Sequence, residues 1–143
     1  MTALPLREQL AGPLVLPQPY LLFLGDTTEV GYAKTALGLR DWAGDLCVGE
    51  LVLPGGTVTT GLPRMSPAEA RVAGARALVI GVANSGGVIK DSWVKTLVEA
   101  LYQGLDIISG MHARLTDIPV LACAGGGHGP QIIEIRTPPR EIP

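Results

Sequence analysis

Charged residues, cysteines and long hydrophobic runs are all scarce in this sequence. Only 17% of the 143 residues are charged, and eleven basic against thirteen acidic side chains give a net charge of -2. This balance excludes the broad cationic surface that drives nonspecific binding to nucleic acid. No apolar run approaches the ~20 residues of a membrane-spanning helix. We therefore expect neither a nucleic acid nor a membrane as partner.

The two cysteines, Cys47 and Cys123, each lie in an apolar stretch without a neighbour at metal-ligand spacing. We expect two buried, reduced thiols in a cytoplasmic protein and no bound metal. The sequence also lacks a serine elbow, paired histidines and a cysteine–histidine signature, so nothing in it supports covalent or metal catalysis.

The chain divides into three segments by composition. Residues 1–19 are rich in proline and lack the features of a signal peptide, so we expect a loosely held N-terminal arm. Residues 20–136 have the pattern of one folded domain. Residues 137–143 crowd prolines and charges together, which is typical of the start of a linker to a further C-terminal domain.

Short apolar runs alternate with segments of helical period in the central segment. The runs lack polar alternation, as expected for strands that are covered on both faces. The order predicts an α/β fold, a three-layer, doubly wound and mainly parallel five-stranded sheet of the Rossmann-like class. The five expected strands are Tyr20–Gly25, Cys47–Leu53, Ala77–Ala83, Asp106–Gly110 and Gln131–Arg136.

Three expected helices separate the first four strands. Ser66 and Glu69 have the spacing of a capping box at the start of one helix. Residues 28–42 have a helical period with Val30, Ala33, Leu37 and Trp42 facing inward, and a third helix places Trp93 in the core.

Ligands in such sheets bind beyond the carboxyl ends of the strands, where this sequence is rich in glycine and small polar residues. Tight turns favour the same residue types, but four such loops on one edge favour a site. Gly55 and Gly56 follow the second strand. The candidate ligand-binding residues in the other three loops are Gly25, Asp26, Asn84, Ser85, Gly86, Gly87, Ser109, Gly110 and Arg114, with His112 as a candidate acid or base.

The segment from Gly25 to Thr35 superficially resembles a phosphate-binding P-loop, because it follows a strand and contains Lys34. The spacing excludes that motif, since five residues instead of four separate Gly25 from Gly31 and Lys34 lies three residues past Gly31. A dinucleotide-binding fingerprint is absent as well.

Several strings, in order, resemble the N-terminal Rossmann-like domain of the D-glutamate N-acetyltransferase family. They are YLLFLGD, AKTALGL, CVGEL, LPGG, LVIGVANSGGVI, DSWV and GLDIISGMHARL. The resemblance implies a cytoplasmic, homo-oligomeric enzyme in which a C-terminal domain with a true P-loop follows this one. It also implies acetyl transfer from acetyl-CoA to the amine of D-glutamate, with no cofactor held in this domain.

The resemblance extends to Lys34, Thr35 and the candidate site residues named above. The expected ligand is a small anionic molecule, an amino acid or an acyl-CoA. As a hypothesis, Asn84, Ser85 and the amides of Gly86 and Gly87 hold a carboxylate. Arg114 pairs with a second carboxylate, and His112 accepts the ammonium proton. Two alternatives stay open, a noncatalytic assembly module and a small stand-alone nucleotide- or CoA-binding domain.

Overall fold

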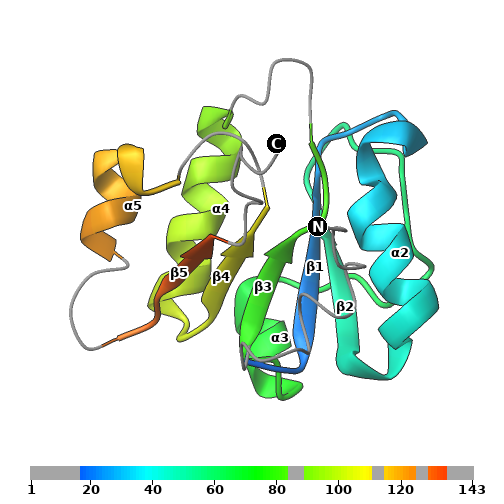
Figure 1. The fold of residues 1–143 in the computed structure, drawn as a ribbon, viewed down its shortest axis with the longest axis horizontal. Coiled ribbons are helices and arrows are strands. Elements are labelled where there is room, and N and C mark those ends of the chain that lie inside the picture. The colour runs from blue at the N-terminus through cyan, green and yellow to red at the C-terminus, as the bar shows by residue number, and fades with distance from the viewer. Residues whose placement is uncertain (1–16, 84–88, 111–114, 125–128, 135–143) are drawn as a thin grey trace, which may run out of the picture.

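The computed structural model describes residues 17–83, 89–110, 115–124 and 129–134. Its core is a five-stranded, all-parallel sheet in the order β2-β1-β3-β4-β5, which confirms the predicted Rossmann-like α/β class (Figure 1). The strands are β1 (Tyr20–Gly25), β2 (Cys47–Val52), β3 (Ala77–Ile80), β4 (Asp106–Ser109) and β5 (Ile132–Glu134).

Four α-helices connect successive strands in the part of the chain that the structure describes. Right-handed crossovers in this strand order place α2 on one face of the sheet and the other three helices on the opposite face. The contacts agree, because α4 packs against both α3 and α5, whereas α2 packs against β1, β2 and β3. The helices are α2 (Lys34–Ala43), α3 (Pro67–Val72), α4 (Asp91–Tyr102) and α5 (Pro119–Ala124).

The strand β1, which lies between β2 and β3, is buried along its whole length, as its unbroken apolar run predicts. Phe23 points toward α4, where its ring meets the Trp93 indole edge-on with centroids 5.4 Å apart. On the other face, α2 approaches the end of β3 so closely that a Cβ added to Gly81 would lie 2.6 Å from the Cβ of Ala36. Helices α4 and α2 therefore pack closely on opposite faces of the sheet near the carboxyl ends of β1 and β3.

The capping box is confirmed at the start of α3. The Ser66 hydroxyl accepts a hydrogen bond from the Glu69 amide at 3.1 Å, and the Glu69 carboxylate accepts one from the Ser66 amide at 2.8 Å. Gly74, just past the helix, has φ +103°, the left-handed conformation expected where glycine ends a helix.

The expected inward positions of Val30 and Trp42 are wrong. Residues 30–33 form a tight 3-10 turn (Val30–Ala33), whose three residues per turn shift the phase and leave Val30 62% exposed. In α2 the buried stripe is Ala36, Leu39 and Ala43, so Trp42 lies beside it and is 48% exposed.

One of the two cysteines is buried as expected, and the other is exposed. Cys123 is exposed, because α5 is only six residues long and turns Leu121 instead toward the core. Cys47 is buried at the start of β2, and burial together with the Asp45 charge raises the pKa of its thiol to about 11. This thiol is therefore protonated at neutral pH.

The strand ends also differ from expectation. The strands β2, β3 and β4 end one to three residues early, at Val52, Ile80 and Ser109. After β3 the backbone leaves the sheet ladder to bond the segment before α2, since the Ala83 amide donates to the Tyr32 carbonyl. Residues 135–136, expected in the last strand, lie outside the described residues.

The buried carboxylate of Glu50 binds the loop of residues 59–64, which runs along the outer edge of β2. Glu50 is fully buried, and its two oxygens accept hydrogen bonds from the Thr59 hydroxyl (2.7 Å), the Thr60 hydroxyl and amide (both 2.6 Å) and the Arg64 guanidinium (3.3 Å). Burial alone raises the pKa of Glu50, but these hydrogen bonds outweigh it and hold the pKa below its usual range. The loop therefore covers an otherwise exposed strand edge.

Substituting Gly81→Ala should lower the free energy of unfolding by about 1–3 kcal/mol, because the added methyl group overlaps Ala36 and α2 must shift. Urea denaturation measures this loss. Gly31→Ala is the matched control, since no atom lies within 4 Å of the added methyl group. Equal stability of the two variants would contradict the close approach of α2 to β3.

Substituting Glu50→Gln should lower the free energy of unfolding by about 2–3 kcal/mol, because an amide replaces one of two oxygens that face only donors. Glu99→Gln on the exposed face of α4 makes the same chemical change at a carboxylate that has no hydrogen bond to any described residue. If denaturation shows the same small effect in both variants, Glu50 does not fasten the loop.

Candidate functional site

The strand order places a switch point between β1 and β3. From β1 the chain crosses outward to β2, then returns past β1 to β3, so the connections that leave β1 and β3 run in opposite directions. Doubly wound sheets bind ligands in the crevice that such a reversal opens beyond the carboxyl ends of the strands. Gly25, the last residue of β1, and Asp26 directly after it lie at this switch point, as do Gly81–Ala83 after β3.

Asp26 is the centre of a polar cluster at this switch point. Its carboxylate accepts hydrogen bonds from the Trp93 indole N–H at 3.0 Å and from the Lys90 ammonium at 3.2 and 3.1 Å. Both donors belong to the start of α4, 64 and 67 residues along the chain. The side chains of Asp26 and Lys90 are 27% and 47% exposed, so both are within reach of a ligand.

Trp93 is a rigid part of this cluster. It is only 1% exposed and packs against Phe23. Gly25 has φ +59°, and a Cβ at this position would lie 2.9 Å from the indole ring. The packing of Trp93 thus accounts for glycine at the end of β1, which the sequence suggested was there to let a ligand approach.

The hydrogen bond from Trp93 is the largest cause that holds the pKa of Asp26 below its usual range. Partial burial opposes this shift, and the Lys90 ammonium adds to it through a hydrogen bond and its charge. The Asp26 carboxylate is therefore ionised at neutral pH and can accept hydrogen bonds or pair with a cation.

The remaining predicted residues do not all meet at this point. Lys34 is exposed at the first residue of α2, followed by half-buried Thr35. Ser109 ends β4 and is 1% exposed, so its own side chain has almost no surface for a ligand, and Gly110 beside it is exposed. The other predicted residues, Asn84, Ser85, Gly86, Gly87, His112 and Arg114, lie outside the described residues, and their roles stay predictions.

The sequence did not point to two members of the cluster. Lys90 gave no motif, although it directly precedes the helix that follows β3. Trp93 was interpreted only as a core residue, but a buried indole usually needs a partner for its N–H, and this rule could have directed attention to a nearby carboxylate.

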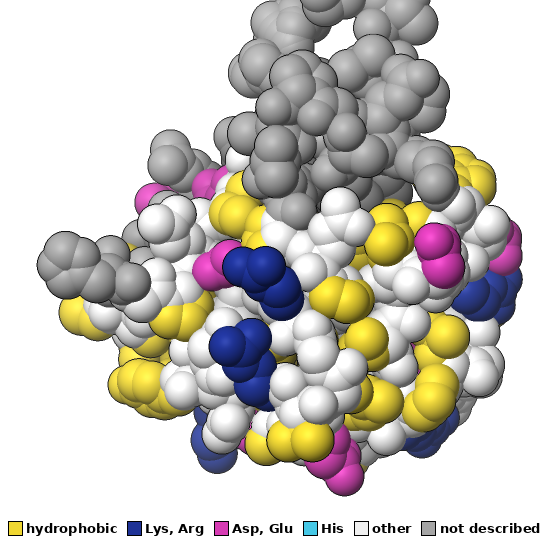
Figure 2. All heavy atoms as spheres, turned by 90° about the horizontal axis from the view of Figure 1, so that it is seen from below, with side chains coloured by type: hydrophobic (Ala, Val, Ile, Leu, Met, Phe, Trp, Pro, Cys, Tyr) yellow, Lys and Arg dark blue, Asp and Glu magenta, His cyan; other side chains and the backbone are white. Residues whose placement is uncertain are grey.

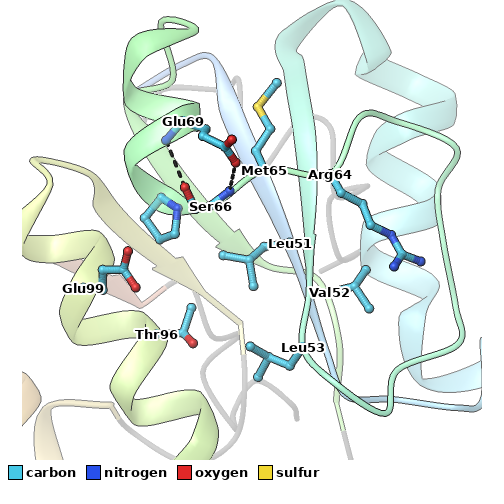
Figure 3. Close-up of a pocket in the computed structure, with 10 residues that line it drawn as sticks. Leu51, Val52, Leu53, Arg64, Met65, Ser66, Glu69, Thr96 and Glu99 are labelled. Carbon is cyan, nitrogen blue, oxygen red and sulfur yellow. Dashed lines mark hydrogen bonds between the residues drawn. The ribbon is translucent and has the colours of Figure 1, made fainter.

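An open groove of about 350 Å³ lies between α3, α4 and the end of β2 (Figure 3). Leu51 of β2 and Leu53 just after it project into the groove opposite Thr96 and Glu99 of α4, as the sticks in Figure 3 show. The amide of Leu53 donates to the carbonyl of Gly25, the residue before Asp26. The lining is completed by Val52, Arg64, Met65, Ser66, Pro67 and Glu69.

Among the described residues, no three His, Cys, Asp or Glu side chains lie close enough to hold a metal ion together. None of the described helices combines the length and the hydropathy of a membrane-spanning segment.

The family of the chain follows from comparison with known proteins. A family model described as a domain of unknown function (DUF1611_N), Rossmann-like domain, matches residues 50–138. The chain belongs to this family. The DUF1611_N domain also resembles the crystal structure of a DUF1611 family protein from Anabaena variabilis, with a TM-score of 0.66 and 28% identity over 86% of this chain and 38% of that one.

Two curated relatives of this DUF1611_N domain carry the name D-glutamate N-acetyltransferase. The protein from Tritonibacter scottomollicae is 46% identical over 129 residues, and that from a Pseudoalteromonas species is 44% identical over 120 residues. These alignments cover 90% and 84% of this chain. The chain spans only 39% and 36% of the length of these two relatives. The resemblance seen in the sequence to the N-terminal domain of this family is confirmed.

Substituting Asp26→Asn should lower the free energy of unfolding by about 1 kcal/mol at pH 7, a modest loss because the pair is partly exposed. The folded-state pKa of Asp26 lies below the unfolded value of about 3.9. Its stabilisation is therefore complete above the unfolded value and lost as the pH falls through the folded value.

Denaturation at a series of pH values measures the difference between the wild-type protein and Asp26→Asn. The difference should shrink toward zero as the pH falls from 5 to below the folded pKa. Asp117→Asn is the control, because this exposed carboxylate has no hydrogen bond among the described residues. A difference that stays constant with pH would contradict the role of the charged carboxylate.

Proposed function

We propose that this domain binds the amino acid substrate of a D-glutamate N-acetyltransferase at the switch point between β1 and β3. The observation that carries the proposal is the exposed pair of Asp26 and Lys90, which lies where doubly wound sheets bind ligands. The name of the two curated relatives supplies the substrate class.

The pair has the charges that a zwitterion needs. An α-amino acid carries an ammonium group next to a carboxylate, which match Asp26 and Lys90 respectively. When the ion pair opens, the ligand ammonium takes the place of Lys90 beside Asp26, and the ligand carboxylate takes the place of Asp26 beside Lys90. The charges therefore stay balanced. Because Lys90 is 47% exposed on a flexible stem, it can turn from Asp26 toward a ligand without disturbing the core.

An acyl-CoA fits this place less well than an amino acid does. Its several phosphates would meet one lysine that is already paired with a carboxylate. The groove has two carboxylates, Glu69 and Glu99, against one guanidinium, Arg64, in its lining, so its excess of negative charge also disfavours phosphate. We therefore propose that acetyl-CoA is held by a further, C-terminal domain of a longer polypeptide, in keeping with the greater length of the relatives.

Acetyl transfer to the amine requires loss of one ammonium proton before the nitrogen attacks the thioester carbonyl. Asp26 is suited to orient the ammonium group, but its lowered pKa makes it a weak base. His112 stays the predicted acceptor of the proton. A cytoplasmic homo-oligomer likewise stays part of the proposal.

The face at the amino ends of the strands gives little support to the alternative of an assembly module. Figure 2 shows this face from below, with hydrophobic side chains in separate groups among Lys, Arg, Asp and Glu side chains. Large exposed hydrophobic residues such as Val72 and Tyr102 are present in the described part, but single exposed apolar residues are normal on a folded surface.

Titration calorimetry of the 143-residue chain with D-glutamate, L-glutamate and acetyl-CoA tests the proposal. We expect D-glutamate to bind, and Asp26→Asn and Lys90→Gln each to weaken binding by about tenfold or more through loss of a charged hydrogen bond. Asp91→Asn is the matched control, because it removes a neighbouring exposed carboxylate that makes no hydrogen bond or ion pair with Asp26 or Lys90 in the described structure.

Two results would overturn the proposal. Unchanged D-glutamate affinity in Asp26→Asn and Lys90→Gln would move the ligand away from the switch point. Binding of acetyl-CoA but not of D-glutamate would replace the amino acid site with a CoA-binding domain.

A further inference from the structure

We propose that Trp93 is a positioning residue for the ligand, because its indole N–H fixes the Asp26 carboxylate in the orientation that receives the ammonium group. This inference rests on the proposed function, since it takes Asp26 as the acceptor of that group. The indole acts through Asp26 and does not itself touch the ligand.

Trp93 and Lys90 hold Asp26 in different ways. The indole nitrogen donates to Oδ1 at 3.0 Å from a ring that is 1% exposed. The Lys90 ammonium bonds Oδ1 at 3.2 Å and Oδ2 at 3.1 Å from a side chain that is 47% exposed. Lys90 can therefore leave when a ligand arrives, whereas Trp93 stays in place.

The surroundings of the ring explain why it stays in place. The ring of Phe23 meets it edge-on with an interplanar angle of 78°, and the backbone of Gly25 approaches so closely that no side chain fits between. The same residue, Gly25, directly precedes Asp26 in the chain. The indole thus fixes both the backbone before Asp26 and one of its carboxylate oxygens.

This arrangement leaves one oxygen for the ligand. When Lys90 turns to the carboxylate of the amino acid, Oδ1 keeps the indole hydrogen bond and Oδ2 becomes free for the ammonium group. A carboxylate held at one oxygen loses rotational freedom before the ligand arrives, and such preorganisation strengthens binding.

Among the described residues, Lys90 is the charged group that contacts Asp26, and the other contact is the uncharged indole. Removing the indole N–H therefore leaves the charge around Asp26 unchanged. Any effect on its titration then reports the hydrogen bond and not a change in net charge.

Trp93→Phe tests the proposal, because it keeps an aromatic ring against Phe23 and removes the N–H. We expect the dissociation constant for D-glutamate at pH 7 to rise about tenfold. We also expect the pKa of Asp26, followed by the ¹³C shift of its carboxyl carbon, to rise toward its usual value. Leu97→Val is the matched control, since it loosens the buried face of α4 without touching Asp26, and both readouts should stay as in the wild-type protein.

A mutation-free readout covers the case in which Trp93→Phe does not fold. In the wild-type protein, the indole proton resonance of Trp93 should shift with the same pH midpoint as the Asp26 carboxyl carbon and should shift again on addition of D-glutamate. An indole proton that responds to neither would overturn the proposal.

The outcomes separate this inference from the proposed function. If Asp26→Asn weakens D-glutamate binding but Trp93→Phe leaves the affinity and the Asp26 titration unchanged, Trp93 is only a core residue and the proposed function stands. If Asp26→Asn itself binds D-glutamate like the wild-type protein, the proposed function is wrong, whatever Trp93 does.

Discussion

The packing of the Trp93 indole against the end of β1 is the constraint on which this domain depends most. The Trp93 ring packs between β1 and α4, excludes any side chain at Gly25 and donates a hydrogen bond to Asp26, the first polar residue after the strand. Core packing and the geometry of the candidate site are therefore set by the same side chain. A smaller residue in this place would remove the indole hydrogen bond and leave Asp26 with Lys90 as its hydrogen-bond partner among the described side chains.

Glu50 and Asp26 differ in burial and in hydrogen-bond partners, and this difference decides which carboxylate has a surface for a ligand. Glu50 is completely buried, and three residues of one loop supply donors to both of its oxygens, so its charge stabilises structure and has no surface for a ligand. Asp26 keeps about a quarter of its side chain exposed and shares its oxygens with Lys90, a half-exposed lysine. Only the second arrangement can exchange a protein partner for a ligand group.

The sequence predicted the fold better than the site. Apolar runs of strand length and the capping box of Ser66 and Glu69 are local signals, and both are present in the structure. Asp26 could be selected because strand ends face one edge in a parallel sheet. Its partners could not, because Lys90 and Trp93 lie more than sixty residues away. Only the crossover from β2 back past β1 to β3 brings them to the end of β1. The role of Glu50 was missed for a similar reason, since its donors follow in a loop whose path along the strand edge has no sequence signal.

The electrostatics of the switch point bear on the ligand that the proposed function assigns to it. A paired lysine and aspartate have no net charge, so they favour a ligand whose own charges are balanced and adjacent over one that carries several phosphates. The groove has two carboxylates, Glu69 and Glu99, against one guanidinium, Arg64, in its lining, so it does not supply the excess of positive charge that several phosphates need. The charge distribution of the described surface therefore supports the proposal that this domain holds the amine and that the acetyl donor is held elsewhere.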